Sequence, residues 1–319
     1  MSEVTIRPPD FKSEHFVKPI ALQRLHCHFA HWLNTLGQNG KTSRMILGFT
    51  GPHGIGKTWL LKYLEHASEL RLPKPFFFNL EDPESINDTA KIKQEINKEL
   101  LHLEGKGPVL LLDNVPPPPL REPLTTFEYE VLRPCADAGA LIVMALTTEN
   151  NVCWYATYLR AVEPLSLKPF SEAQTQDQLA KLGTNLDSAD IHNRSGGLPL
   201  LSYLFNEHNG DDQAFDDLLS YWFSRIPQSD QERIRQYLDI TCLLNSIEDS
   251  KVEEIAGSPF FFAVPAFEIR NVLKKHGLTE TVDDDAPLVL REAIKKAAQR
   301  RLEEENPSLY NSLMQTIQK

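Results

Sequence analysis

The sequence lacks any apolar run long enough to span a membrane, and its N-terminal residues lack the apolar core of a signal peptide. We therefore expect a cytoplasmic protein with no membrane-spanning segment. Cysteine is also scarce. The four cysteines are not spaced as C-x-x-C, which argues against a disulfide framework or a zinc site.

Positive charge is in short supply as well. Lys and Arg number 33 against 44 Asp and Glu, for a net charge of −11. Nonspecific affinity for nucleic acid comes mainly from Lys and Arg that release counterions from phosphates. We therefore do not expect DNA to be a partner, and look for function in a small-molecule site.

One stretch carries a specific chemistry, and it directly follows the apolar run Met45–Thr50. It fits the phosphate-binding pattern G-x-x-x-x-G-K-[ST] and reads Gly51-Pro52-His53-Gly54-Ile55-Gly56-Lys57-Thr58. Glycines let backbone N–H groups surround phosphate oxygens, and the helix that follows adds its positive end. Lys57 then reaches the β- and γ-phosphates, and Thr58 binds magnesium. We count Trp59, the next residue, among the nucleotide-binding residues. The pattern predicts binding of ATP or ADP with Mg²⁺.

A second motif supplies a carboxylate. Four apolar residues, 109–112, end in Asp113, which predicts an acid at the carboxyl end of a buried strand and a role in the magnesium shell. Asn114 follows, where a second acid would deprotonate the attacking water. Asparagine can position water but cannot take its proton. We expect ATP hydrolysis to be slow. Thr147, after the apolar run 140–146, is a candidate sensor of the γ-phosphate or a plain strand cap.

The order of elements predicts the fold class α/β plus α. Apolar runs at 45–50, 76–80, 109–112, 140–146 and 165–167 alternate with helical patterns at 57–69, 88–103 and 127–138, which is typical of a parallel sheet covered on both faces. Helices follow at 171–182, 198–207 and 211–223. The last part has three helical patterns and a small hairpin, the outline of a winged-helix domain, with Asp283–Asp285 in the expected wing. We expect a lead-in with an amphipathic helix (1–40), a P-loop nucleotide domain (41–170), a helical domain (171–225) and a winged-helix domain (226–319).

The motifs GPHGIGKT, LLLDN, ALTT and GGLPL, in this order and at these separations, resemble the STAND class of P-loop proteins, the signal-transduction ATPases with an NB-ARC/AP-ATPase-like core. The resemblance covers residues 14–302. It implies that Pro199 contacts the adenine base and that a winged helix packs against the nucleotide.

Two functions remain open from the sequence. The first is an ATP/ADP switch of the STAND type, with slow hydrolysis, which couples nucleotide state to domain rearrangement and to binding of a partner or of itself. The alternative is an AAA-type ATPase, of the loader or origin type, whose winged helix binds DNA. Arg133, Arg160 and Arg194 are alternatives for γ-phosphate contact or for a finger that acts in trans. Lys295, Lys296, Arg300 and Arg301 form a basic cluster, which we interpret as a solvated face.

Overall fold

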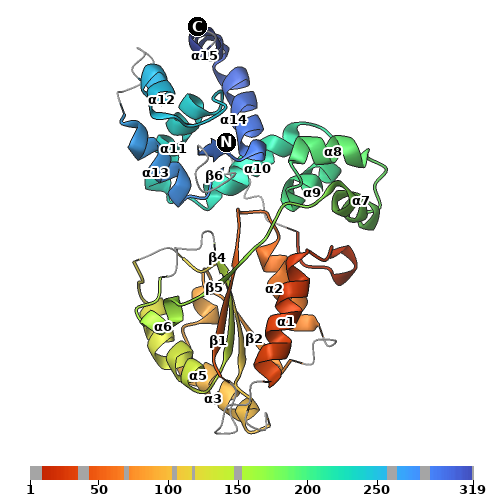
Figure 1. The fold of residues 1–319 in the computed structure, drawn as a ribbon, viewed down its shortest axis with the longest axis vertical. Helices are drawn as coiled ribbons and strands as arrows, with labels where there is room; N and C mark the ends of the chain where they lie inside the picture. Colours follow the sequence, from red (N-terminus) through yellow and green to blue (C-terminus); the bar gives the residue numbers. More distant parts are fainter. Residues whose placement is uncertain are drawn as a thin grey trace. The chain divides into compact units, whose positions relative to one another are not determined.

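The computed structural model describes residues 9–34, 43–67, 72–102, 106–116, 119–146, 153–256, 264–280 and 288–317. Contacts divide the chain into two compact units (Figure 1). The first contains the described residues of 11–168. The second contains those of 169–319 together with Pro9 and Asp10. The expected division into four domains stays a prediction.

The first unit is built on a five-stranded sheet in the order β2-β3-β4-β1-β5. Every neighbouring pair is parallel, which confirms the expected α/β sheet. The strands are β1 (Met45–Thr50), β2 (Pro75–Asn79), β3 (Val109–Asp113), β4 (Leu141–Leu146) and β5 (Glu163–Ser166). All residues of β3 and β4 are buried, as expected for strands covered on both faces.

Helices cover both faces of this sheet. Figure 1 shows α1 (Ala21–Asn34) and α2 (Lys57–His66) on one side and α5 (Arg133–Asp137) and α6 (Thr157–Arg160) on the other. Side chains of successive strand residues point to opposite faces of the sheet. Leu110 and Leu112 belong to the same hydrophobic cluster as buried residues of α3 (Thr89–Leu100) and α6 (Thr157–Arg160). The 3₁₀ turns η1 (Ser13–His15) and η3 (Pro83–Ser85) complete the connections.

The sequence predicts one helix over 127–138, and the structure is helical there but not as one regular α-helix. The segment contains α4 (Leu124–Phe127), the π-helix η4 (Glu128–Leu132) and α5 (Arg133–Asp137). The Arg133 amide donates to the Glu128 carbonyl, five residues back. Pro134 follows and has no N–H to donate, so a regular helical ladder cannot continue through it.

The second unit is helical apart from one short strand pair. Its helices are α7 (Glu172–Lys181), α8 (Ser188–Ser195), α9 (Pro199–Glu207), α10 (Gln213–Ser224), α11 (Gln228–Thr241), α12 (Asp249–Ala256), α13 (Ala266–Lys275), α14 (Glu292–Glu305) and α15 (Pro307–Ile317). Strands β6 (Thr279–Glu280) and β7 (Val289–Leu290) pair antiparallel. Three helices followed by this pair match the expected element order, while the winged-helix assignment itself remains a proposal.

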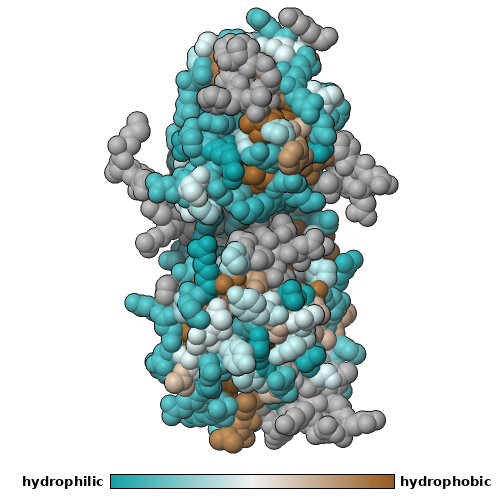
Figure 2. Space-filling view, turned by 90° about the vertical axis from the view of Figure 1, so that its left-hand side faces the viewer, coloured by the Kyte–Doolittle hydropathy of each residue, from teal (hydrophilic) through white to brown (hydrophobic). Residues whose placement is uncertain are grey.

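Within the described ranges, no helix is both long and apolar enough to cross a membrane. The face of the protein drawn in Figure 2 is mostly hydrophilic or neutral, with a few hydrophobic areas.

Candidate nucleotide site

The loop between β1 and α2 has the backbone that its glycines allow. Gly51, Gly54 and Gly56 have φ values of +146°, +86° and +97°, which L side chains rarely adopt. Gly56 directly precedes α2, so the loop ends at the N-terminus of a ten-residue helix. A Cβ on Gly51 would lie 3.2 Å from Ile55 Cγ2 and 3.4 Å from the Leu167 carbonyl. This geometry can surround a phosphate with backbone amides and a helix end.

Lys57 is the first residue of α2, and its side chain bends back over the loop. Nζ donates to the carbonyl oxygens of Gly51 at 2.5 Å and Pro52 at 2.8 Å. The ammonium group therefore already lies beside the loop that would hold the phosphates. His53 lies in the same loop. Trp59 follows Thr58 in the first turn of α2, and the centre of its ring lies 5.4 Å from the centre of the Phe11 ring in an edge-to-face contact.

Thr58 and Asp113 meet although 55 residues separate them. Thr58 Oγ1 donates to Asp113 Oδ1 at 3.1 Å. Asp113 is 3% exposed, and burial raises the pKa of its carboxyl, although the Thr58 hydrogen bond and the Lys57 charge oppose that shift. A desolvated carboxylate with a hydroxyl beside it supplies the hard oxygen ligands that Mg²⁺ prefers. Thr58 and Asp113 are the residues that would hold a magnesium ion here.

Asn114 and Asn79 form an amide pair next to Asp113. Asn114 Nδ2 donates to Asn79 Oδ1 at 2.9 Å, and Asn114 has a φ of +53°. The sequence reasoning missed Asn79. Its signal is its position: Asn79 ends β2, is in register with Asp113, and so lies at the same carboxyl edge of the sheet. No described group of three or more His, Cys, Asp or Glu side chains could hold a metal ion without further ligands.

Two expected contacts are not brought to this edge by the described structure. Thr147 lies outside the described residues, as do Asp283–Asp285 of the expected wing. Pro199 begins α9 in the other unit, so its contact with adenine stays a prediction.

The turn before Pro199 is tightly packed. The Phe170 amide donates to the Gly197 carbonyl at 2.8 Å, and a Cβ on Gly197 would lie 2.2 Å from the Phe170 carbonyl. Gly197 has a φ of +72°. The Pro199 carbonyl accepts from Gln178 Nε2 at 2.9 Å. A glycine is therefore required here for packing, whatever the turn binds.

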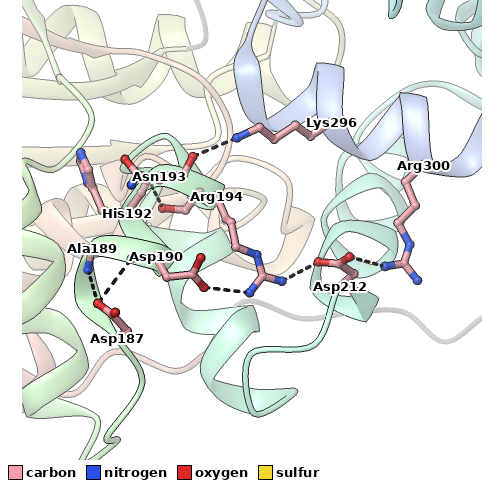
Figure 3. A network of polar contacts seen from close by, with 10 residues as sticks. Asp187, Ala189, Asp190, His192, Asn193, Arg194, Asp212, Lys296 and Arg300 are labelled. Atoms are coloured by element: carbon pink, nitrogen blue, oxygen red, sulfur yellow. Dashed lines mark hydrogen bonds and ion pairs between the residues drawn. The ribbon is translucent and has the colours of Figure 1, made fainter.

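The three candidate arginines differ in their partners. Arg133 forms two hydrogen bonds to Glu128 Oε1, at 3.0 and 2.8 Å. Arg194 contacts Asp190 at 3.2 Å and Asp212 at 2.5 Å (Figure 3). Arg160 is exposed and donates to the Thr157 hydroxyl at 3.4 Å. Among the described residues, no carboxylate pairs with Arg160.

Arg160 also lies at the wrong end of the sheet to serve its own loop. It precedes β5, whose first residue, Glu163, is in register with Leu47 of β1. The phosphate loop follows the other end of β1, and four residues of strand span about 13 Å. Arg160 therefore lies away from the phosphate loop of its own chain.

The basic residues of α14 do not form a solvated face, so that expectation is wrong. Lys296 Nζ donates to the Asn193 carbonyl at 2.9 Å, and Arg300 contacts Asp212 at 3.2 Å (Figure 3). Arg301, only 12% exposed, pairs with Asp239. These cations join α14 to neighbouring helices of its unit.

No protein-family model and no curated protein matches the chain. Similar solved structures include a Thermotoga maritima RuvB variant, 17% identical, with 86% of this chain and 93% of that chain covered and a TM-score of 0.41. Another is Aeropyrum pernix Orc1 in complex with DNA, which is 16% identical, with 92% of this chain and 94% of that chain covered and a TM-score of 0.41. A third is the replication initiator DnaA bound to AMPPCP and single-stranded DNA, which is 13% identical, with 96% of this chain and 95% of that chain covered and a TM-score of 0.47. Likenesses at these TM-scores assign no function to this chain. The STAND resemblance gains no support from them, and neither does the expectation against DNA.

Proposed function

We propose that the protein is a P-loop ATPase that binds Mg·ATP and hydrolyses it slowly. The observation that carries the proposal is the hydrogen bond between Thr58 and Asp113, which joins the phosphate loop to the end of β3. In this arrangement Lys57 would hold the β- and γ-phosphates, while Thr58 and Asp113 would hold magnesium. Asn114 replaces the base, so water is positioned but not deprotonated.

Calorimetry with Lys57→Ala tests this proposal. The variant loses the positive charge at the loop, so ATP affinity should fall by at least tenfold without a change in fold. Lys62→Ala is a matched control: it removes a lysine from the same helix, where Lys62 pairs with Glu65 at 2.9 Å. The control should bind ATP as the wild type does. Equal affinity in Lys57→Ala and wild type would overturn the proposal.

For hydrolysis we propose that Arg160 of a second copy reaches the γ-phosphate. Its support is the exposure of Arg160, its lack of a carboxylate partner among the described residues, and its place far from its own loop. An arginine supplied in trans stabilises charge on the transferred phosphoryl group. If Arg160 acts in this way, the protein must self-associate in the ATP state.

The AAA-type alternative is favoured by α13, the third helix of the proposed winged helix. Phe267 is 60% exposed, and Asn271 and Lys274 are exposed one and two turns further along the same face. An exposed helix face with an aromatic, an amide and a cation can contact DNA.

Two measurements separate these outputs. Duplex and single-stranded DNA are titrated at physiological salt with ADP or a non-hydrolysable ATP analogue, and particle mass is measured in parallel. Sub-micromolar, ATP-dependent DNA binding that Lys274→Ala weakens favours the AAA-type reading. Growth in particle mass without DNA binding favours the STAND-type switch. Lys251→Ala, on the neighbouring α12, is the control for loss of one lysine.

A further inference from the structure

Glu128 is a buried carboxylate whose role the nucleotide site does not explain. It belongs to the π-helix η4 and is 1% exposed. Four hydrogen bonds reach it: Arg133 gives two to Oε1, the Tyr155 amide donates to Oε2 at 2.7 Å, and the Ala156 amide donates to Oε1 at 2.9 Å. A buried charge is costly unless it is paired and hydrogen-bonded, and here both conditions hold.

These contacts fix the segment that leads into α6. Tyr155 and Ala156 directly precede α6, and Arg160 is its last residue. Trp154, just before them, is 1% exposed, and its indole Nε1 lies 3.3 Å from Met144 Sδ of β4. The start of α6 is therefore held by η4 and by β4, and its other end passes into β5. The short helix has little freedom to shift along the sheet.

The charge balance of this contact also matters for Arg160. Arg133 pairs with Glu128 through both Nε and Nη2, and its guanidinium lies 4.5 Å from the centre of the Tyr129 ring. The negative charge of Glu128 is thus already balanced by Arg133, and the carboxylate does not compete for the Arg160 guanidinium. Arg133 supplies the pairing charge, while Arg160 keeps its own charge for another group. The two arginines, only 27 positions apart, have separate tasks.

We propose that Glu128, held by Arg133, is a positioning residue that orients α6 so that Arg160 can reach the γ-phosphate bound by a second copy of this chain. The inference rests on the proposed function of Arg160. Hydrolysis converts ATP and water to ADP, inorganic phosphate and a proton, and Glu128 takes no part in the bond changes. It acts only on the copy that donates Arg160. A small misplacement of a transition-state contact can cost about 10²-fold in rate.

Mixing two inactive variants tests the inference. Lys57→Ala binds ATP too weakly to turn it over but can donate Arg160, and Arg160→Ala can bind ATP but cannot donate. The mixture should hydrolyse labelled ATP in a single turnover faster than either variant alone. Arg121→Ala, an exposed arginine of the same unit, replaces Arg160→Ala as a control and should need no donor. If the mixture is no faster than its components, Arg160 does not act in trans and the inference falls, while nucleotide binding by Lys57 stands as a separate result.

Glu128→Gln is then placed in each role. In the donor, together with Lys57→Ala, it should lower the mixed rate by about 10- to 100-fold. In the receiver, together with Arg160→Ala, it should leave ATP affinity and the mixed rate unchanged, which shows that the variant is folded. Glu130→Gln, in the same π-helix and paired with Lys93 at the surface, is the matched control. A Glu128→Gln donor as active as the Lys57→Ala donor overturns the positioning role.

Two further readouts keep the test decisive. Cys153 is 5% exposed at the start of the held segment, and burial raises the pKa of its thiol to about 12. Alkylation of Cys153 should accelerate in Glu128→Gln, whereas that of Cys135, equally buried in α5, should not.

If the Glu128→Gln receiver fails to bind ATP, the Arg133→Lys variant tests the positioning role instead. Lysine keeps the positive charge beside Glu128 but cannot form the paired hydrogen bonds of the guanidinium. A donor carrying Arg133→Lys that retains full activity would contradict the proposal.

Discussion

At the scale of single residues, Asp113 carries a carboxylate whose charged form is disfavoured by burial. It is nearly fully buried, and burial raises the pKa of its carboxyl above the ordinary value of 3.8. The folded state therefore binds this proton more tightly than the unfolded chain. Stability from this group is fully present below pH 3.8 and is lost as pH rises through the raised pKa of the folded state.

Asp113→Asn should therefore stabilise the protein at pH 7 in the absence of magnesium, and stabilise it less at pH 4. Magnesium should no longer tighten ATP binding, because the amide is a weaker ligand than a carboxylate. Urea unfolding at both pH values, with magnesium titrations by calorimetry, measures these effects. Asp137→Asn, an exposed acid of the same unit, should change neither. A stabilisation equal at pH 4 and pH 7 would show that ionisation of Asp113 is not its cause.

Asn114 sets the rate of hydrolysis. Its φ of +53° lies in the left-handed region, which Asn and Asp adopt more readily than most residues. Asn114→Asp therefore adds a carboxylate with little strain, and it should raise turnover by about 10²-fold, the lower range for general base catalysis. Steady-state phosphate release measures the change. Asn114→Ala removes the amide without adding a base and should not gain activity. An unchanged rate in Asn114→Asp would mean that another residue organises the water.

Much of this site follows from sequence, and the reason is local. The loop 51–58 has a fixed pattern, and Asp113 is found because it ends a buried run. Asn79 could not be singled out in the same way. It has no motif of its own, and only the register of β2 with β3 puts it beside Asn114. The pairing of Arg133 with Glu128 also depends on the π-helix rather than on any spacing that the sequence displays.

At the scale of elements, Asp212 joins helices that are distant in sequence. Its carboxylate lies between Arg194 of α8 and Arg300 of α14 (Figure 3). Arg300 also approaches Asp216 at 3.8 Å and Glu304 at 3.0 Å. Without the Asp212 charge, two guanidinium groups face each other across this point. The contact thus links residues of the expected helical and winged-helix domains.

Asp212→Asn should lower the free energy of unfolding of this unit by about 1 kcal/mol, the upper range for exposed ion pairs. Asp212 is 52% exposed, so salt should screen the effect, which should shrink between 0.05 and 0.5 M salt as the screening length falls. Urea unfolding at the two salt concentrations is the measurement. Glu303→Gln makes the same change of charge on α14, has no ion pair among the described residues, and should stay within about 0.5 kcal/mol of wild type. A loss that does not depend on salt would contradict the electrostatic account.

Element prediction succeeded where burial is continuous. The strands and most helices lie within a few residues of the expected positions, because long apolar runs between helical patterns allow few other arrangements. It failed at α8, whose residues Ser188–Ser195 show two buried positions and no strong apolar face. Asp187 starts that helix by accepting from Ala189 N at 2.9 Å, a cap signal that periodicity alone does not register. The expected helix at 127–138 is helical in the structure, but periodicity did not show the π-helix at Glu128–Leu132.

At the scale of the whole molecule, the question is whether a bound nucleotide contacts residues of one unit or of both. Lys57, Thr58 and Asp113 belong to the unit of residues 11–168, while Pro199 belongs to the other. A ligand stabilises only the parts whose unfolding releases it, by about 2.7 kcal/mol at a hundredfold excess over Kd. If Pro199 contacts adenine, as the STAND resemblance implies, unfolding of either unit must weaken binding.

We therefore expect a non-hydrolysable ATP analogue with magnesium to slow hydrogen exchange in both β4 and α10, which report the two units separately. Mass spectrometry of peptides from 141–146 and 213–224 measures each rate. Pro199→Ala removes the ring at the start of α9, and it should abolish the slowing in α10 while preserving that in β4. Gly183→Ala is a control in the same unit, because a Cβ there meets nothing within 4 Å, although its φ of +73° adds some strain. Slowing confined to β4 in the wild type would show that the first unit binds nucleotide alone, and that the second unit takes its signal from another contact.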